Sequence, residues 1–116
     1  MLNPGIPDNE PERIELLKAL GILDTPPENR FERITQLASR ICNMPISLMS
    51  LVDTNRQWFK STHGLDMKET PRNLSFCAHA ILQNKTFYIE DTKNDERFQD
   101  HPMITGHPHI RDCLLE

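Results

Sequence analysis

The segment that most restricts the fold is the amphipathic helix predicted between Thr25 and Cys42. Thr25 is a favourable N-cap, Pro26 suits the first helical position, and Glu28 completes the spacing of a capping box. The apolar residues recur at helical spacing and mark one face: Phe31, Ile34, Leu37, Ala38, Ile41 and Cys42. Such a face belongs to the core, or forms a dimer seam if it is unusually exposed.

Two strand-like segments follow this helix. The run "ISLMSLV" at 46–52 carries no charge and predicts a buried strand. The "DTNR" turn at 53–56 and the segment "QWFKST" at 57–62 predict that a second strand returns antiparallel to the first. A helix followed by a β-hairpin is therefore the central expectation.

The flanking segments complete the predicted order. Apolar spacing predicts a short amphipathic helix from residue 12 that stops at Gly21. After the hairpin we expect a loop at 63–73, a short helix at 74–82 capped by Asn73 or Ser75, and strands at 85–91 and 109–116. The connector between those strands has space for one helical turn at "DERF". This order predicts an α+β fold in which helices flank an antiparallel sheet.

Length and charge exclude several classes of protein. The 116 residues suffice for one domain, which we place at 12–116 after a proline-rich N-terminal arm at 1–11. A net charge of −4 without a basic run gives no footprint for nucleic acid. The apolar stretches are too short to span a bilayer, and the N-terminus has no apolar signal-peptide core. Three widely spaced cysteines fit free thiols, so we expect a cytoplasmic protein.

Six motifs in order resemble the GAF domain, and in particular the bacterial subgroup that precedes histidine kinases and diguanylate cyclases. They cover 20–111 and read "LGILDTPPE", "MPISLMSLVD", "RQWFKS", "ETPR", "SFCAHAI" and "PHIR". The resemblance implies a central antiparallel sheet, with helices on one side and loops around a small-molecule pocket on the other. It also implies a non-enzymatic sensory role, a ligand of unknown identity, a homodimer and an attached output domain.

The resemblance ends before the chain does. In the subgroup, "PHIR" is followed by two further strands and a closing helix, whereas this chain continues as "DCLLE". The resemblance places the missing strands in the middle of the sheet, beside "ISLMSLV". An apolar strand with an exposed edge pairs readily with another chain. We therefore expect a C-terminally incomplete GAF domain, completed by a longer protein or by a second copy.

The resemblance and the residue types together give six candidate ligand-binding residues: Trp58, Arg72, Phe76, Cys77, His79 and Asp91. Trp58 and Phe59 are neighbours on a strand, so one faces the core and the other a pocket or contact surface. Arg72 suits an anionic ligand group, although a structural salt bridge is the favoured interpretation. Asp91 either contacts the ligand or caps the following turn.

Cys77 and His79 are candidates for chemistry as well as packing. Positions two apart on a helix point about 200° from each other, which disfavours a shared metal or a thiolate–imidazole pair. We therefore expect Cys77 to pack inward and His79 to cap the helix or line the pocket edge. We predict no catalytic residue and no metal site, since His101, His107 and His109 lack the spacing of a zinc motif.

Two alternatives remain open. One GAF lineage, the free methionine sulfoxide reductases, uses cysteines around the pocket, and Cys77 and Cys113 lie in loosely similar places. The glycine that flanks the helix cysteine in that lineage is replaced here by Phe76 and Ala78. The other alternative is a dimerisation module without a ligand. A bilin at Cys77 is disfavoured because Ala78 separates the cysteine from the histidine.

Overall fold

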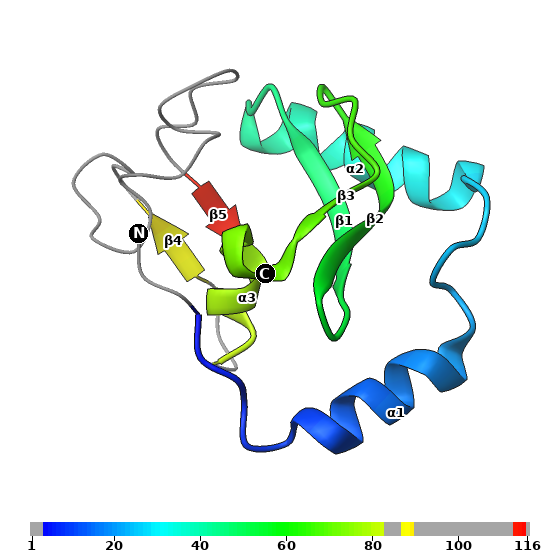
Figure 1. Ribbon diagram of the computed structural model, residues 1–116. Helices are drawn as coiled ribbons and strands as arrows, with labels where there is room; N and C mark the ends of the chain where they lie inside the picture. Colours follow the sequence, from blue (N-terminus) through cyan, green and yellow to red (C-terminus); the bar gives the residue numbers. More distant parts are fainter. Residues whose placement is uncertain (1–3, 83–86, 90–112, 116) are drawn as a thin grey trace. The chain divides into compact units, whose positions relative to one another are not determined.

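The computed structural model describes residues 4–82, 87–89 and 113–115 (Figure 1). The chain forms two compact units, one of residues 8–72 and one of residues 1–7 with 73–116. In the first unit, helices precede an antiparallel sheet, which confirms the predicted α+β class. No helix in the described ranges is both long and apolar enough to cross a membrane.

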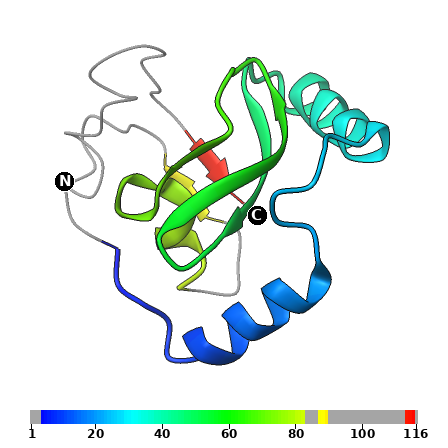
Figure 2. The same cartoon turned by 45° about the vertical axis from the view of Figure 1, so that its right-hand side comes forward.

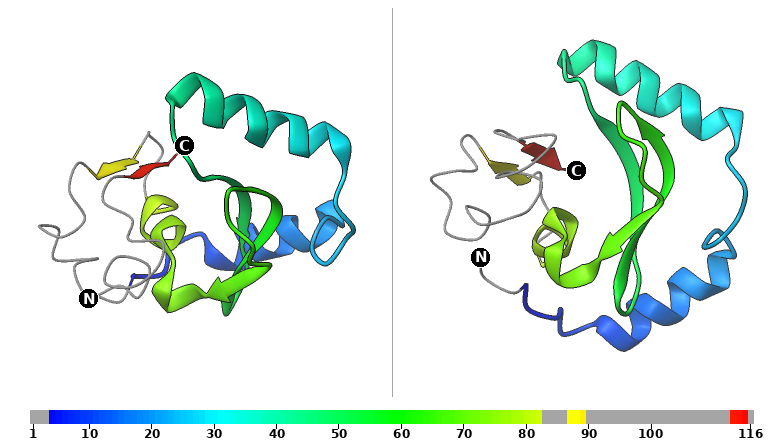
Figure 3. Two further views of the ribbon diagram at one scale, coloured as in Figure 1. Left: turned by 90° about the horizontal axis from the view of Figure 1, so that it is seen from above. Right: turned by 45° about the horizontal axis from the view of Figure 1, so that its top comes forward.

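Two helices begin the first unit. α1 (Glu10–Leu20) ends at Gly21, whose φ of 66° is left-handed and whose N–H donates to the carbonyl of Lys18. This confirms the predicted stop. α2 (Asn29–Cys42) ends at Asn43, which is also left-handed. Figure 3 shows α1 and α2 as separate helices joined by the connection at 21–28.

The predicted start of the second helix was wrong. α2 begins at Asn29, and Glu28 precedes it in an extended conformation without a side-chain cap. The Thr25 hydroxyl donates to the carbonyl of Ile22 and accepts a hydrogen bond from Nζ of Lys60. The Thr25 hydroxyl therefore stabilises the connection between α1 and α2 and does not cap α2. It binds Lys60, a buried residue of β2.

Three antiparallel strands follow in the order β1-β2-β3. β1 (Ser47–Val52) and β2 (Arg56–His63) confirm the predicted hairpin. The loop predicted at 63–73 was wrong in part, since β3 (Glu69–Pro71) pairs with the first residues of β2. Figure 2 shows α2 alongside the hairpin, against which it packs.

A β-bulge changes which side chains of β2 face α2. Phe59 pairs with Ser50 and Ser61 pairs with Met49, so Lys60 is the extra residue. The side chains of Met49 and Ser50, which are consecutive on β1, point to opposite faces of the sheet. Their partners on β2, Ser61 and Phe59, therefore also point to opposite faces. The Ser61 hydroxyl lies 2.8 Å from that of Thr35 on α2. The bulge thus directs Ser61 towards α2.

The apolar face of α2 is less buried than the sequence predicted. Thr35 is the fully buried residue of this helix. Ile34, Leu37 and Ile41 are 52%, 57% and 74% exposed. The core interpretation is therefore wrong for these three residues, because the sheet contacts a neighbouring part of the helix. The dimer-seam interpretation is the one that their exposure favours.

The described part of the second unit contains short elements. A 3₁₀ turn (Arg72–Leu74), which begins at the last residue of the first unit, leads into α3 (Phe76–Ala80). The Ser75 hydroxyl accepts a hydrogen bond from the N–H of Ala78. This confirms the predicted helix and its Ser75 cap. β4 (Phe87–Ile89) and β5 (Cys113–Leu115) fall within the strands predicted at 85–91 and 109–116, and the structure pairs them antiparallel. The "DERF" turn and Asp91 lie outside the described residues.

Candidate functional site

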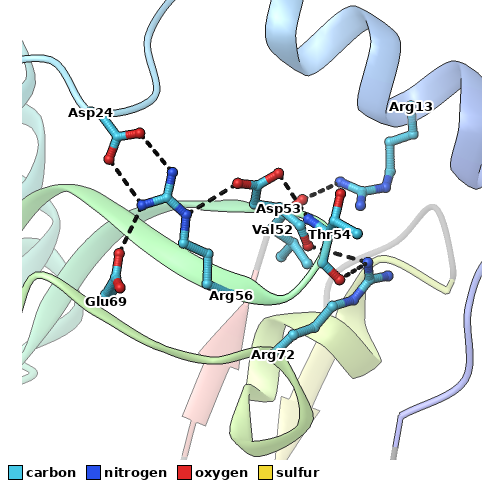
Figure 4. A network of polar contacts seen from close by, with 8 residues as sticks. All are labelled: Arg13, Asp24, Val52, Asp53, Thr54, Arg56, Glu69 and Arg72. Atoms are coloured by element: carbon cyan, nitrogen blue, oxygen red, sulfur yellow. Dashed lines mark hydrogen bonds and ion pairs between the residues drawn. The ribbon is translucent and has the colours of Figure 1, made fainter.

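The densest polar cluster of the first unit surrounds the turn between β1 and β2. Its first centre is Arg56, the first residue of β2 (Figure 4). Its guanidinium donates to both carboxylate oxygens of Asp24, at 2.9 and 2.8 Å. It also donates to Asp53 at 3.1 Å and to Glu69 at 2.8 Å. One arginine therefore joins the α1–α2 connection, the end of β1 and β3.

Two of the carboxylates around Arg56, those of Asp24 and Asp53, are held in their ionised form. Hydrogen bonds from Arg56 lower the pKa of Asp24, which is exposed and lies at a left-handed φ of 61°. At Asp53 burial is the largest influence and acts to raise the pKa. Hydrogen bonds from the Thr54 N–H and from Arg56 outweigh it, so the pKa of Asp53 is lowered. The field of Arg56 thus favours the charged state of both carboxylates.

The second centre is Glu10, in the first turn of α1. Arg72 donates to its two oxygens at 2.6 and 3.0 Å, and Arg13 donates to it at 2.7 Å. These hydrogen bonds, that of Arg72 first, lower the pKa of Glu10 to about 2. The side chains of Glu10 and Arg72 are only 17% and 10% exposed, so this is a largely buried bidentate pair.

Both arginines of this second centre also bind the main chain of the turn. Arg13 donates to the carbonyl of Val52, and Arg72 donates to the carbonyls of Asp53 and Thr54 at 3.2 and 3.4 Å (Figure 4). We call the two centres together the turn network, which consists of Glu10, Arg13, Asp24, Asp53, Arg56, Glu69 and Arg72. The turn network holds α1 against the sheet mainly by polar contacts, because α1 buries a single apolar side chain, that of Leu17.

A third charged group was missed by the sequence reasoning. Lys60 has a side chain that is 1% exposed, and its Nζ lies 2.8 Å from a carboxylate oxygen of Glu28. It also donates to the Thr25 hydroxyl at 2.7 Å and to the Pro26 carbonyl at 2.6 Å. The hydrogen bond from Lys60 lowers the pKa of Glu28. A lysine within a strand pattern carries no signal of this role, since the bulge that redirects the strand is not visible in the sequence.

We expect Lys60→Met to destabilise the protein by about 1–2 kcal/mol, because the Thr25 and Pro26 acceptors lose their donor. Glu28→Gln should cost less, since Glu28 is 42% exposed and the amide oxygen still accepts from Lys60. Urea titration of the single variants and of the double variant measures both effects and their coupling. A larger loss of stability in Glu28→Gln than in Lys60→Met would contradict the contact between Lys60 and Glu28. So would a double variant whose loss of stability equals the sum of the two single losses.

The structure locates most of the six predicted ligand residues. Trp58 and Phe59 are both buried, at 7% exposed each. Trp58 pairs with Leu51 and Ser61 pairs with Met49. Because Leu51 and Met49 are two residues apart on β1, Trp58 lies on the same face of the sheet as Ser61. Arg72 makes the ion pair that was the favoured interpretation. His79 is buried at 8% exposed and Cys77 is half-buried, both on α3.

The remaining predicted positions are less fully described. Phe76 is the first residue of α3, and Asp91 lies outside the described residues. Trp58 and Arg72 belong to one unit, and Phe76, Cys77 and His79 to the other. A common pocket for these residues therefore stays a prediction. The histidines considered as metal ligands, at 101, 107 and 109, lie outside the described ranges, within which no metal-binding cluster of His, Cys, Asp or Glu occurs.

Comparison with known proteins identifies a family and a relative. The family model of the GAF domain matches residues 26–115. A cyclic di-GMP phosphodiesterase of Pseudomonas aeruginosa is 40% identical over 111 residues, which are 96% of this chain. The chain spans only 19% of the length of that relative.

Proposed function

Because this chain belongs to the GAF domain family, we propose that it is a non-enzymatic regulatory module that binds a small ligand and controls an attached output domain. The family is matched over residues 26–115. The P. aeruginosa relative is named a phosphodiesterase, and the matching region is about a fifth of its length. This division supports a regulatory role for the matched region, with the output activity carried by another part of a longer protein.

The single observation that carries the proposal is the position of Arg72. It ends the first unit, and its guanidinium holds Glu10 of α1 and the carbonyls of the β1–β2 turn. Four residues later the chain enters α3, where Phe76, Cys77 and His79 are proposed to contact the ligand, with Trp58 and Asp91 as further contacts. A ligand that rearranged this segment would displace Arg72 and so weaken its hydrogen bonds to Glu10 of α1 and to the β1–β2 turn.

We further propose that the module acts as a homodimer. The exposed apolar residues Ile34, Leu37 and Ile41 recur at spacings of three and four along α2, which is the spacing of a helix-packing seam. A regulatory module that changes the arrangement of two copies can transmit a signal to output domains attached to each copy. The ligand and the dimer are independent parts of the proposal.

The ligand is tested by native mass spectrometry of the full chain purified from its own cells. We expect a bound mass that is lost on denaturation and lost in His79→Ala. His63→Ala is the matched control, because His63 ends β2 outside the predicted ligand residues. Absence of a bound mass from the wild type, or its retention in the folded His79→Ala protein, would contradict the proposed ligand site.

The enzymatic alternative is tested separately. Thioredoxin-dependent reduction of free methionine sulfoxide is expected to be absent from the wild type. The control is Cys77→Ser, which removes the thiol that a reductase of this kind would use. Turnover by the wild type that disappears in Cys77→Ser would replace the regulatory proposal with a redox enzyme.

A further inference from the structure

The exposed stripe on α2 has a basic border. Arg33 and Arg40 are exposed, and because they are seven residues apart they lie on the same side of the stripe formed by Ile34, Leu37 and Ile41. In a parallel pairing of two α2 helices, these arginines would face the positions of Phe31 and Ala38, which offer no carboxylate. In an antiparallel pairing, they would approach the same arginines of the other copy. Pairing of α2 with itself is therefore not favoured by charge.

A complementary surface lies on α1 of the same chain. Leu16 and Leu20 are 63% and 57% exposed and lie one turn apart. Glu12 and Glu15 are exposed on the adjoining side of this helix. This acidic border matches the basic border of the α2 stripe. The α1 helix of 11 residues and the α2 helix of 14 residues extend about 16 and 21 Å, so they are similar in length.

We propose that α1 of one copy docks on the α2 stripe of a second copy of this chain. Leu16 and Leu20 would pack on Ile34, Leu37 and Ile41, with Glu12 and Glu15 beside Arg33 and Arg40 of the other copy. A twofold axis would generate this helix pair twice, which increases the apolar area buried in one dimer. The inference rests on the dimer part of the proposed function and names its interface.

The proposed docking would connect the turn network to the dimer interface, because both involve α1. Glu10 of α1 is paired with Arg72, and Arg13 binds the carbonyl of Val52, so the sheet holds α1 by its first turn. In the proposed dimer, a neighbouring flank of α1, which carries Leu16 and Leu20, contacts the second copy. A change at Arg72 would therefore reach the dimer interface through one helix.

Sedimentation velocity of the full chain over a concentration series tests the proposal. The wild type is expected to dimerise. Leu37→Glu should weaken the dimer by about a hundredfold, because a carboxylate would enter the apolar contact. The charge reversal Arg33→Glu with Arg40→Glu should weaken it by about tenfold or more. Lys68→Glu, an exposed reversal outside both helices, is the matched control and should leave the dimer unchanged.

The decisive variant combines both reversals in one chain: Arg33→Glu, Arg40→Glu, Glu12→Arg and Glu15→Arg. It restores opposite charges across every α1–α2 contact of the dimer and should recover association. Circular dichroism checks that each variant is folded. A monomeric wild type would overturn the proposed dimer itself. A wild-type dimer that resists Leu37→Glu, or a folded four-residue variant without recovery, would overturn the interface alone.

Discussion

Gly64→Ala is expected to destabilise the protein by about 3 kcal/mol or more, which is a large effect for a single substitution. Gly64 has a φ of 81°, and an added Cβ would lie 2.0 Å from the carbonyl oxygen of Pro45 and 3.1 Å from its carbonyl carbon. Both are main-chain atoms, so the end of β2 would have to move away from the start of β1. Urea denaturation at pH 7 measures the loss.

Gly21→Ala is the matched control for this prediction. Gly21 is also left-handed, with a φ of 66°, but an added Cβ there meets no atom within 4 Å. The control therefore isolates the cost of the backbone conformation, which is about 1–2 kcal/mol for a residue with a side chain. Equal losses at the two positions would contradict the close approach between Gly64 and Pro45.

Glu10→Gln is expected to cost about 3 kcal/mol at pH 7. The pairing with Arg72 and Arg13 lowers the pKa of Glu10 from 4.5 to about 2, and each pKa unit corresponds to about 1.4 kcal/mol. The substitution also leaves the Arg72 guanidinium, which is 10% exposed, without its ionised partner. Denaturant titration at pH 7 tests this loss.

The same pair gives a pH dependence with a defined direction. The pKa of Glu10 is lower in the folded protein than in the unfolded chain, so its contribution is complete above about pH 4.5. That contribution is lost as the pH falls towards 2. Stability measured between pH 5 and pH 3 should therefore fall less in Glu10→Gln than in the wild type. A parallel fall in both proteins would contradict the pairing.

Asp8→Asn provides the control for both measurements. Asp8 is exposed and precedes α1 without taking part in the turn network. The substitution removes one carboxylate from the same segment, and we expect its effect on stability to stay within about 0.5 kcal/mol. A loss in Asp8→Asn similar to that in Glu10→Gln would indicate a general effect of charge near the start of α1.

Much of the fold could be predicted because local signals carry it. The charge-free run at 46–52 and the Asp- and Asn-containing turn specify the β1–β2 hairpin, and Ser75 specifies the start of α3. β3 was missed because its three residues, Glu69–Pro71, have no strand pattern of their own. They become a strand by pairing with β2, which is a property of the tertiary structure.

The candidate site was less predictable than the fold. Arg72 was identified as either a ligand contact or a salt-bridge residue, but its partner Glu10 is 62 residues away in sequence. Arg56 and Lys60 gave no signal at all, because nothing local distinguishes a buried, paired cation from an exposed one. Their partners are brought together only when the α1–α2 connection lies against β2.

Residue type and spacing along the chain were enough to specify the family, the order of the helices and of the strands other than β3, and the helix stop at Gly21. The tertiary structure decided which face of α2 is buried and which carboxylate meets each arginine. The bulge at Lys60 and the contacts of the β1–β2 turn set those outcomes. They depend on segments distant in sequence, whose approach no local pattern encodes.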